Sequence, residues 1–226
     1  MKKIAIGTHC VNYRDVRRKR CQNDAMYTLL ENKYKEVEVC SFNFEDDVAE
    51  LPFYFPISKS LKRDSKELKT DRRLPYVKDI MDLTCEMDCD IFGSINSDIF
   101  LHKDFFDLFE EDKDVYLFGR TDIEEVNISK FNSKNFRVVW DGHPGCDGFF
   151  FKKEWWLKNR NHFEDSLIWG EPAWDDYYAL LINYLSQNVM TKRAVHHIYH
   201  DTVWTHLSVG AKHNIKYLDE LKEKLS

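Results

Sequence analysis

The order of apolar segments in the first hundred residues most constrains how this chain can fold. A short apolar run over residues 3–8 leads into helical spacing over residues 23–32, and then into apolar–polar alternation over residues 36–44. Apolar residues three and four positions apart indicate a helix, whereas alternation indicates a strand. A strand–helix–strand order predicts a parallel sheet, because parallel strands need a crossover connection and a helix supplies it.

The rest of the chain continues this alternation of short apolar runs and helical segments. We expect helices at residues 74–85, 103–109, 155–159, 175–186 and the carboxyl-terminal end, and strands at residues 90–95, 115–118, 136–140, 149–151 and from 194. Residues 46–70 are expected to form an irregular surface loop. No shift in composition divides the 226 residues. The sequence therefore predicts one α/β domain, residues 1–226, with a mixed, mostly parallel, Rossmann-like central sheet flanked by helices.

Charge and hydropathy exclude two classes of protein. A net charge of −6 is opposite to what a protein that coats nucleic acid needs, although basic runs at residues 14–20 and 62–73 are either phosphate contacts or solvated faces. No run approaches the roughly 20 apolar residues of a membrane span, and none at the amino terminus is typical of a signal segment. A cytoplasmic location is the resulting expectation.

Asn96, Ser97 and Asp98 follow directly after the predicted buried strand at residues 90–95. In open α/β sheets, ligands bind beyond the carboxyl ends of the strands. A carboxylate there can hold Mg²⁺ or Mn²⁺, which in turn neutralises phosphates. A helix N-cap explains the same tripeptide equally simply, because Asn, Ser and Asp are all good caps.

Two later clusters offer further polar chemistry. His197 and His200 belong to a histidine-rich segment, and each is either a ligand for a cation such as Mn²⁺ or a structural histidine. Asp175 and Asp176 open a predicted helix, where acidic residues are ordinary partners of the helix dipole. A carboxylate partly desolvated by the neighbouring tryptophans has the raised pKa that a general base needs.

Residues 90–101, DIFGSINSDIFL, resemble the D-x-D-type segment of GT-A-fold glycosyltransferases. In that family the final Asp coordinates the divalent cation that carries the nucleotide sugar, and this position is Asp98 here. Asn96 stands where many members have the first Asp, so we expect its amide to bind ribose or sugar. A late histidine often joins the same cation, which implies His200 first and then His197. The resemblance implies Mn²⁺ or Mg²⁺ as the cofactor and a UDP-sugar as the donor.

The resemblance assigns roles to other residues as well, with residues 1–100 as the nucleotide-binding half and residues 101–226 as the acceptor-binding half. An acidic residue at the head of a late helix is the base in inverting members, which here means Asp175 or Asp176. The implied donor-binding residues are Thr8, His9, Arg14, Arg73, Asn96, Ser97 and Asp98. The implied sugar- and acceptor-binding residues are Asp147, Gly148, Glu171 and Trp174.

Two other functions remain open from the sequence. One is a metal-dependent phosphohydrolase, for which the candidate residues are Asp98, Asp141, His143, His197 and His200. The other is a non-catalytic carbohydrate-binding module that uses aromatic side chains as stacking surfaces. For a transferase the acceptor hydroxyl belongs to a glycan, a lipid-linked sugar, a protein or a modified DNA base. The sequence leaves the oligomeric state open.

Overall fold

The computed structural model describes residues 2–70, 72–110, 112–200 and 207–226, and a mixed nine-stranded sheet forms its centre. The strand order is β3-β2-β1-β4-β8-β6-β9-β5, and β7 pairs with β6 outside this path. The strands are β1 (Ile4–Thr8), β2 (Val37–Phe42), β3 (Ile57–Ser58), β4 (Ile91–Ile95), β5 (Ile99–Phe100), β6 (Val115–Ile123), β7 (Val138–Trp140), β8 (Cys146–Lys152) and β9 (Val189–Ile198).

The amino-terminal part of the sheet is parallel, as the strand–helix–strand order predicts. Strands β3, β2, β1 and β4 all pair in parallel, and β9 pairs in parallel with β6. Strand β8 lies antiparallel between β4 and β6, β7 runs antiparallel to β6, and β5 runs antiparallel to β9. The carboxyl ends of β1 and β4 therefore meet at one edge of the sheet, beside the end of β9.

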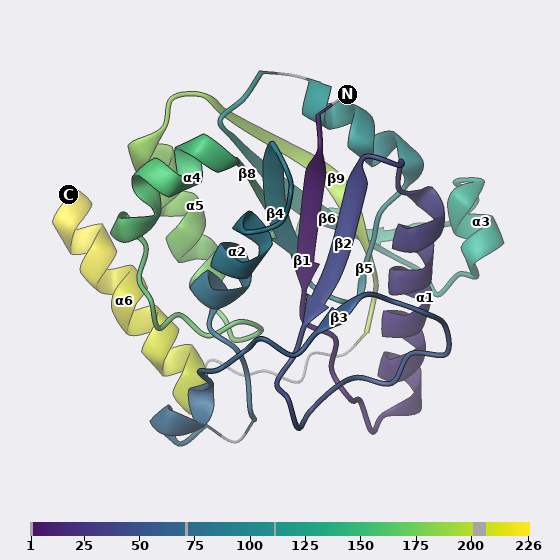
Figure 1. The fold of residues 1–226 in the computed structure, drawn as a ribbon, viewed down its shortest axis with the longest axis horizontal. Coiled ribbons are helices and arrows are strands. Elements are labelled where there is room, and N and C mark those ends of the chain that lie inside the picture. Colours follow the sequence, from purple (N-terminus) through teal and green to yellow (C-terminus); the bar gives the residue numbers. More distant parts are fainter. Residues whose placement is uncertain (1, 71, 111, 201–206) are drawn as a thin grey trace.

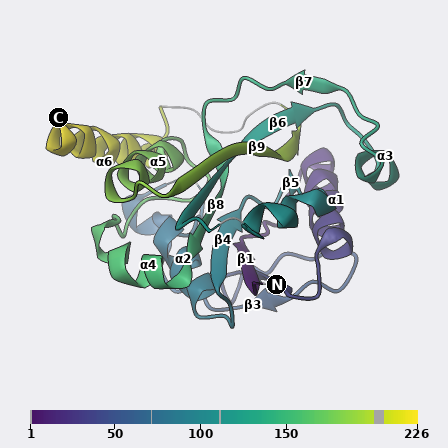
Figure 2. The ribbon, with the colours of Figure 1, turned by 90° about the horizontal axis from the view of Figure 1, so that it is seen from above.

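Helices cover both faces of this sheet (Figures 1 and 2). They are α1 (Val16–Asn32), α2 (Val77–Cys85), α3 (Ile128–Asn132), α4 (Lys153–Asn159), α5 (Trp174–Leu185) and α6 (Val209–Leu225), with 3₁₀ helices η1 (Ser65–Leu68), η2 (Lys103–Glu110) and η3 (Arg160–His162). Alternation along β1 explains the two layers: Ile4 and Ile6 pack with Met26 of α1, and Ala5 packs with Ile80 of α2. Helices α4, α5 and α6 share the α2 face.

Several elements differ from the sequence prediction: β6 continues to Ile123 instead of ending at residue 118, the loop expected at residues 46–70 contains β3 and η1, and α1 and β9 begin earlier than expected. Helix α1 begins at Val16 rather than near residue 23, because the Asp15 carboxylate caps it by accepting the Arg18 backbone N–H at 2.8 Å. Strand β9 begins at Val189 rather than at residue 194, and its first half exposes Lys192 and Arg193, which hide the apolar signal of a strand. Within the described residues, no helix has both the length and the apolar character to cross a membrane.

Candidate functional site

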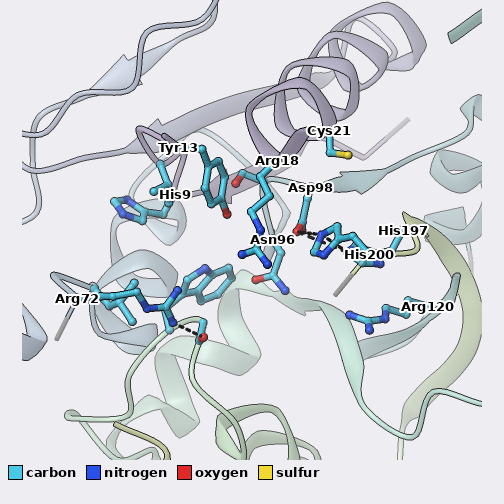
Figure 3. A pocket seen from close by; sticks show the side chains of 15 residues that line it. His9, Tyr13, Arg18, Cys21, Arg72, Asn96, Asp98, Arg120, His197 and His200 are labelled. Atoms are coloured by element: carbon cyan, nitrogen blue, oxygen red, sulfur yellow. Dashed lines mark hydrogen bonds and ion pairs between the residues drawn. The ribbon is translucent and has the colours of Figure 1, made fainter. Parts of the chain in front are cut away.

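A pocket lies beyond the carboxyl ends of β1 and β4, and residues from both halves of the chain line it (Figure 3). His9 follows β1, Asp98 follows β4, and His197 lies near the end of β9. This is the edge at which an open α/β sheet binds ligands. The sequence prediction that Asn96, Ser97 and Asp98 lie at such an edge is confirmed by their places in the pocket wall.

Asp98, His197 and His200 form an Asp–His–His cluster in this pocket. Asp98 Oδ2 lies 3.6 Å from His197 Nε2 and 3.7 Å from His200 Nε2, and the two Nε2 atoms are 3.2 Å apart. Figure 3 shows the carboxylate pointing at both imidazoles. Asp98 does not cap a helix: strand β5 starts at the next residue, and η2 begins at Lys103. One oxygen and two nitrogens thus converge, which is a donor set for a divalent cation.

His197 has a second partner behind the cluster. Its Nδ1–H donates to Asp122 Oδ1 at 2.7 Å, and both side chains are buried. Burial acts to lower the pKa of His197, but its hydrogen bonds with Asp122 and Asp98 outweigh burial and raise the pKa to about 9. Burial likewise acts to raise the pKa of Asp98, but hydrogen bonds from His197 and His200 hold it well below its usual range. Asp98 and His197 are therefore a charged pair, and a cation that bound here would have to displace the proton on His197 Nε2.

Asn96 and Ser97 point away from the cluster centre and fix the loop around it. Asn96 Nδ2 donates to Asp147 Oδ1 at 2.9 Å, and the Ser97 hydroxyl donates to Gln22 Oε1 at 2.8 Å. Gln22 in turn donates to the Val11 carbonyl, so the tripeptide is tied to the start of the chain. Asn96 is accordingly placed for contact with a ligand and with Asp147, while Asp98 alone of the three faces the histidines.

Three arginines, Arg18, Arg72 and Arg120, line the same pocket; we call them the arginine wall. Glu171 orients Arg72 by accepting from its Nη2 at 3.1 Å, and Ser208 donates to the other Glu171 oxygen at 2.7 Å. Glu171 is thus committed to this pair rather than open to an acceptor. Guanidinium groups suit the oxygens of a diphosphate, so the wall has the chemistry of an anion site.

The arginines that line the pocket are not those that the resemblance implies. Arg14 is exposed on the loop before α1, and the next turn of the chain places Arg18 in the pocket instead. Arg73 forms an ion pair with Asp46 and donates to Asp64 Oδ2 at 2.6 Å, so the adjacent Arg72 takes the expected place. Each basic run thus does place an arginine in the pocket. Which arginine of the run reaches the pocket depends on the geometry of the helix or loop that carries it.

Thr8 and His9 were predicted to bind the base and ribose of the donor, but only His9 lines the pocket. Its Nδ1–H donates to the Phe42 carbonyl at 2.8 Å, which fixes the ring. Thr8 is buried at the end of β1, and its hydroxyl has no hydrogen-bond partner among the described residues. Tyr13, which the sequence did not single out, adds an aromatic face, and burial raises its pKa well above the usual value, so it stays protonated.

The predicted catalytic and acceptor residues lie beside the pocket, around the start of α5 and β8. Trp174 is buried and stacks on Trp169, whose ring lines the pocket, with centroids 4.9 Å apart. Gly148 lies inside β8, packed against Phe118. Asp147 lies at the start of β8, where its second oxygen, Oδ2, has no hydrogen-bond partner in the described part of the chain. Trp174 and Gly148 thus support the pocket wall from within the core and do not line the pocket themselves.

Asp175 and Asp176 occupy the first turn of α5 but differ in surroundings. Asp176 is exposed, whereas Asp175 is half-buried and packs against Gly145, where an added Cβ would lie 2.2 Å from its carboxylate. Burial, reinforced by the negative charges of Asp176 and Asp147, raises the pKa of Asp175 to about 7. A carboxyl group that titrates near neutral pH is suited to accept a proton.

Sequence reasoning missed four residues that line this pocket or support it from behind: Tyr13, Arg18, Arg120 and Asp122. Arg120 and Asp122 alternate at the end of an apolar strand, so period-two spacing placed them on one face, but the segment after residue 118 was expected to be a polar excursion. Arg18 lies in helix α1, whose start was placed too late. Earlier recognition of the Asp15 cap would have identified Arg18 as helical.

Comparison with known proteins identifies the fold. No protein-family model and no curated sequence matches this chain. The solved structure of S. aureus TarS 1–349 matches with a TM-score of 0.51 and 12% identity, covering 87% of this chain and 60% of that one. TarS in complex with UDP-GlcNAc matches with a TM-score of 0.55 and 12% identity, covering 88% and 59%. The glycosyltransferase GlyE of Streptococcus pneumoniae matches more loosely, with a TM-score of 0.42 and 11% identity over 99% and 64%.

These matches show that the chain has a GT-A-like α/β fold, as the sequence predicted. The chain spans about 60% of the length of the TarS structures. The likeness is one of fold at low identity, and one matching structure holds a nucleotide sugar.

Proposed function

We propose that this chain is a metal-dependent glycosyltransferase that moves a sugar from a UDP-sugar to an acceptor hydroxyl with inversion. One observation carries the proposal: the Asp–His–His cluster and the arginine wall line the same pocket of a GT-A-like fold. A cation site and guanidinium groups together fit a diphosphate, whose negative charge increases as the sugar departs. UDP-GlcNAc is the first donor to test, because a fold match holds it.

The residues of the cluster fit the proposed cation. Asp98 supplies an oxygen, His197 and His200 supply Nε2 atoms, and these donors lie within 4.8 Å of one another. Imidazole suits transition metals better than Mg²⁺, so Mn²⁺ is the first of the two candidates. When bound, the cation supplies positive charge next to the leaving diphosphate. The arginine wall adds further positive charge in the same pocket, and His9 with Tyr13 supplies the surface for the nucleoside.

Asp175 is the proposed base. The acceptor oxygen attacks C1 of the donor sugar and forms the new C–O bond, while its proton passes to the Asp175 carboxylate. The C1–O bond to the β-phosphate breaks, and its electron pair leaves with UDP. Asp147, whose charge acts on Asp175, accepts a hydrogen bond of 2.9 Å from Asn96 of the pocket wall, and these two residues are the proposed contacts to the donor sugar. In this scheme residues 1–100 bind most of the nucleotide and residues 101–226 supply the base and acceptor side.

The phosphohydrolase alternative receives less support. Three of its five candidate residues form the cluster, but Asp141 is exposed, and His143 Nδ1 accepts the Gly145 backbone N–H in the loop before β8. The cluster brings together three donors, which is enough for one cation and not for the two-cation sites of many phosphatases.

The products of slow turnover without any acceptor distinguish the two reactions. Incubation with UDP-GlcNAc and Mn²⁺ in ¹⁸O-water is expected to give UDP and ¹⁸O-labelled free sugar, because the glycosyl C1–O bond breaks. A phosphohydrolase instead gives UMP and sugar 1-phosphate with ¹⁸O in a phosphate. Mass spectrometry of both products reads out which bond was cleaved. If ¹⁸O appears in a phosphate product, the proposal is contradicted. If the protein binds UDP-GlcNAc but cleaves neither bond, the result favours a carbohydrate-binding module.

A further inference from the structure

The pairing of strand β6 with its two neighbours is irregular at successive positions, on either side of Gly119, close to the buried charges of the pocket. In β8, Asp147 is the extra residue between the partners of Phe118 and Gly119. In β9, Ala194 is the extra residue between the partners of Gly119 and Arg120. An extra residue in one strand reverses which side chains face a given layer beyond it, and such bulges often re-aim side chains next to active sites.

The bulge at Ala194 decides which histidine joins the cluster. Beyond it, Asp122 pairs in register with His197, so both side chains lie on the same face. Without the extra residue, Asp122 would pair with His196. His196 instead faces the opposite side, against the rings of Phe131 and Phe136, with centroids 5.4 and 5.3 Å away. The choice between two adjacent histidines is thus made by one inserted residue.

Asp122 lies deeper than the cluster and is almost fully enclosed, with 1% of its surface exposed. Its Oδ1 accepts the Nδ1–H of His197 at 2.7 Å and lies 3.3 Å from Arg120 Nε. Arg120 Nε lies 3.7 Å from Asp147 Oδ2 on its other side. A buried carboxylate needs such partners, because desolvation without compensation is costly. Asp122 therefore bonds the one ring nitrogen of His197 that does not face Asp98.

We propose that Asp122 is a positioning residue for the cation site: it keeps the proton of His197 on Nδ1 and so directs Nε2, with its lone pair, at the cation. The role rests on the metal part of the proposed function. Carboxylates behind metal-binding histidines fix the ring and strengthen it as a ligand, and their loss weakens metal affinity by about 10- to 100-fold. Asp122 itself touches neither donor nor acceptor.

Replacement of the carboxylate tests this role through metal affinity alone. Asp122→Asn keeps the size of the side chain but removes its charge, and we expect the Kd for Mn²⁺ to rise by about 10- to 100-fold. The free Mn²⁺ signal in electron paramagnetic resonance measures that Kd without nucleotide. Asp147→Asn is the matched control, because Asp147 is also buried beside Arg120 but accepts from Asn96 rather than from a histidine. Its Mn²⁺ Kd should stay within about twofold.

A second measurement avoids any loss of folding in the variants. In the unaltered protein labelled with ¹⁵N-histidine and loaded with Zn²⁺, His197 should retain a proton on Nδ1, with the assignment taken from His197→Asn. Metal on Nδ1, or an equal Mn²⁺ Kd for Asp122→Asn and the unaltered protein, overturns the positioning role while leaving the cation site intact. Absence of Mn²⁺ binding by the unaltered protein contradicts both the metal part of the proposed function and this role.

Discussion

Replacing Asp98 by alanine is expected to lower the rate of UDP release from UDP-GlcNAc in Mn²⁺ by about 10³-fold, or about 4 kcal/mol of transition-state stabilisation. The carboxylate is the oxygen donor of the cluster, and its Oδ2 lies 3.6 Å from His197 Nε2 and 3.7 Å from His200 Nε2. Without it, only the two imidazole nitrogens of His197 and His200 remain as donors for the cation. A coupled assay for UDP at saturating donor measures the effect.

A second aspartate–histidine pair in the molecule supplies the control. Asp104 Oδ2 lies 3.4 Å from His102 Nδ1; neither residue lines the pocket, and Asp104 is exposed. Asp104→Ala removes the same chemical pair without touching the pocket, so turnover should change by less than about twofold. If Asp98→Ala keeps both its turnover and its response to Mn²⁺, the cluster does not hold the catalytic cation.

Asp175→Asn is expected to lower turnover by about 10²- to 10⁴-fold, the contribution typical of a positioned general base. The pKa of Asp175 is about 7 because burial, and then the charges of Asp176 and Asp147, disfavour its ionised form. The base must be ionised to accept a proton, so turnover of the unaltered protein should rise with pH through about 7 and then level off. Asp176→Asn should move this inflection to lower pH, since one of the negative charges is gone. Rate profiles from pH 5 to 9 measure both effects.

The substitution Asp175→Asn is also expected to stabilise the folded protein at pH 8. Asp175 titrates near 3.8 in an unfolded chain and near 7 in the folded one. Between these values the folded state binds more protons, so the unfolding free energy falls as pH rises from about 4 to about 7. The resulting penalty at pH 8 is at most about 4 kcal/mol, and the neutral amide avoids it. Thermal unfolding should therefore show a gain from Asp175→Asn that is clearly larger at pH 8 than at pH 5. If Asp175→Asn lowers both the thermal stability and the turnover at every pH, the Asp175 carboxylate has a structural role and is not the base.

Much of the fold could be predicted from local patterns. The apolar runs that became β1, β2 and β4 are short, bounded and β-rich, and the helix at α2 has clear spacing, so the parallel part of the sheet followed from the sequence. Strand β9 was underestimated because Lys192 and Arg193 interrupt its apolar alternation. The antiparallel insertion of β8 between β4 and β6 rests on long-range pairing that local periodicity does not encode.

The site was predictable where its chemistry is concentrated in short motifs. Asp98 and the two histidines stood out by residue type and by position after a strand, and the structure brings them together. Asp122 and Arg120 did not stand out, because their position beside the pocket depends on bulges that set the register between β6 and its neighbours. A one-residue insertion leaves no composition signal, yet it decides which face a side chain occupies.

Binding of UDP-GlcNAc with and without the cation tests the central claim most directly. Isothermal titration of the donor into the protein should give clear binding with Mn²⁺ and at least about tenfold weaker binding with EDTA, because the cation joins the diphosphate to the Asp–His–His cluster. The same titration with Asp98→Ala should give the weak value in both conditions. Equal affinity for UDP-GlcNAc in Mn²⁺ and EDTA, or no binding in either, would contradict the account.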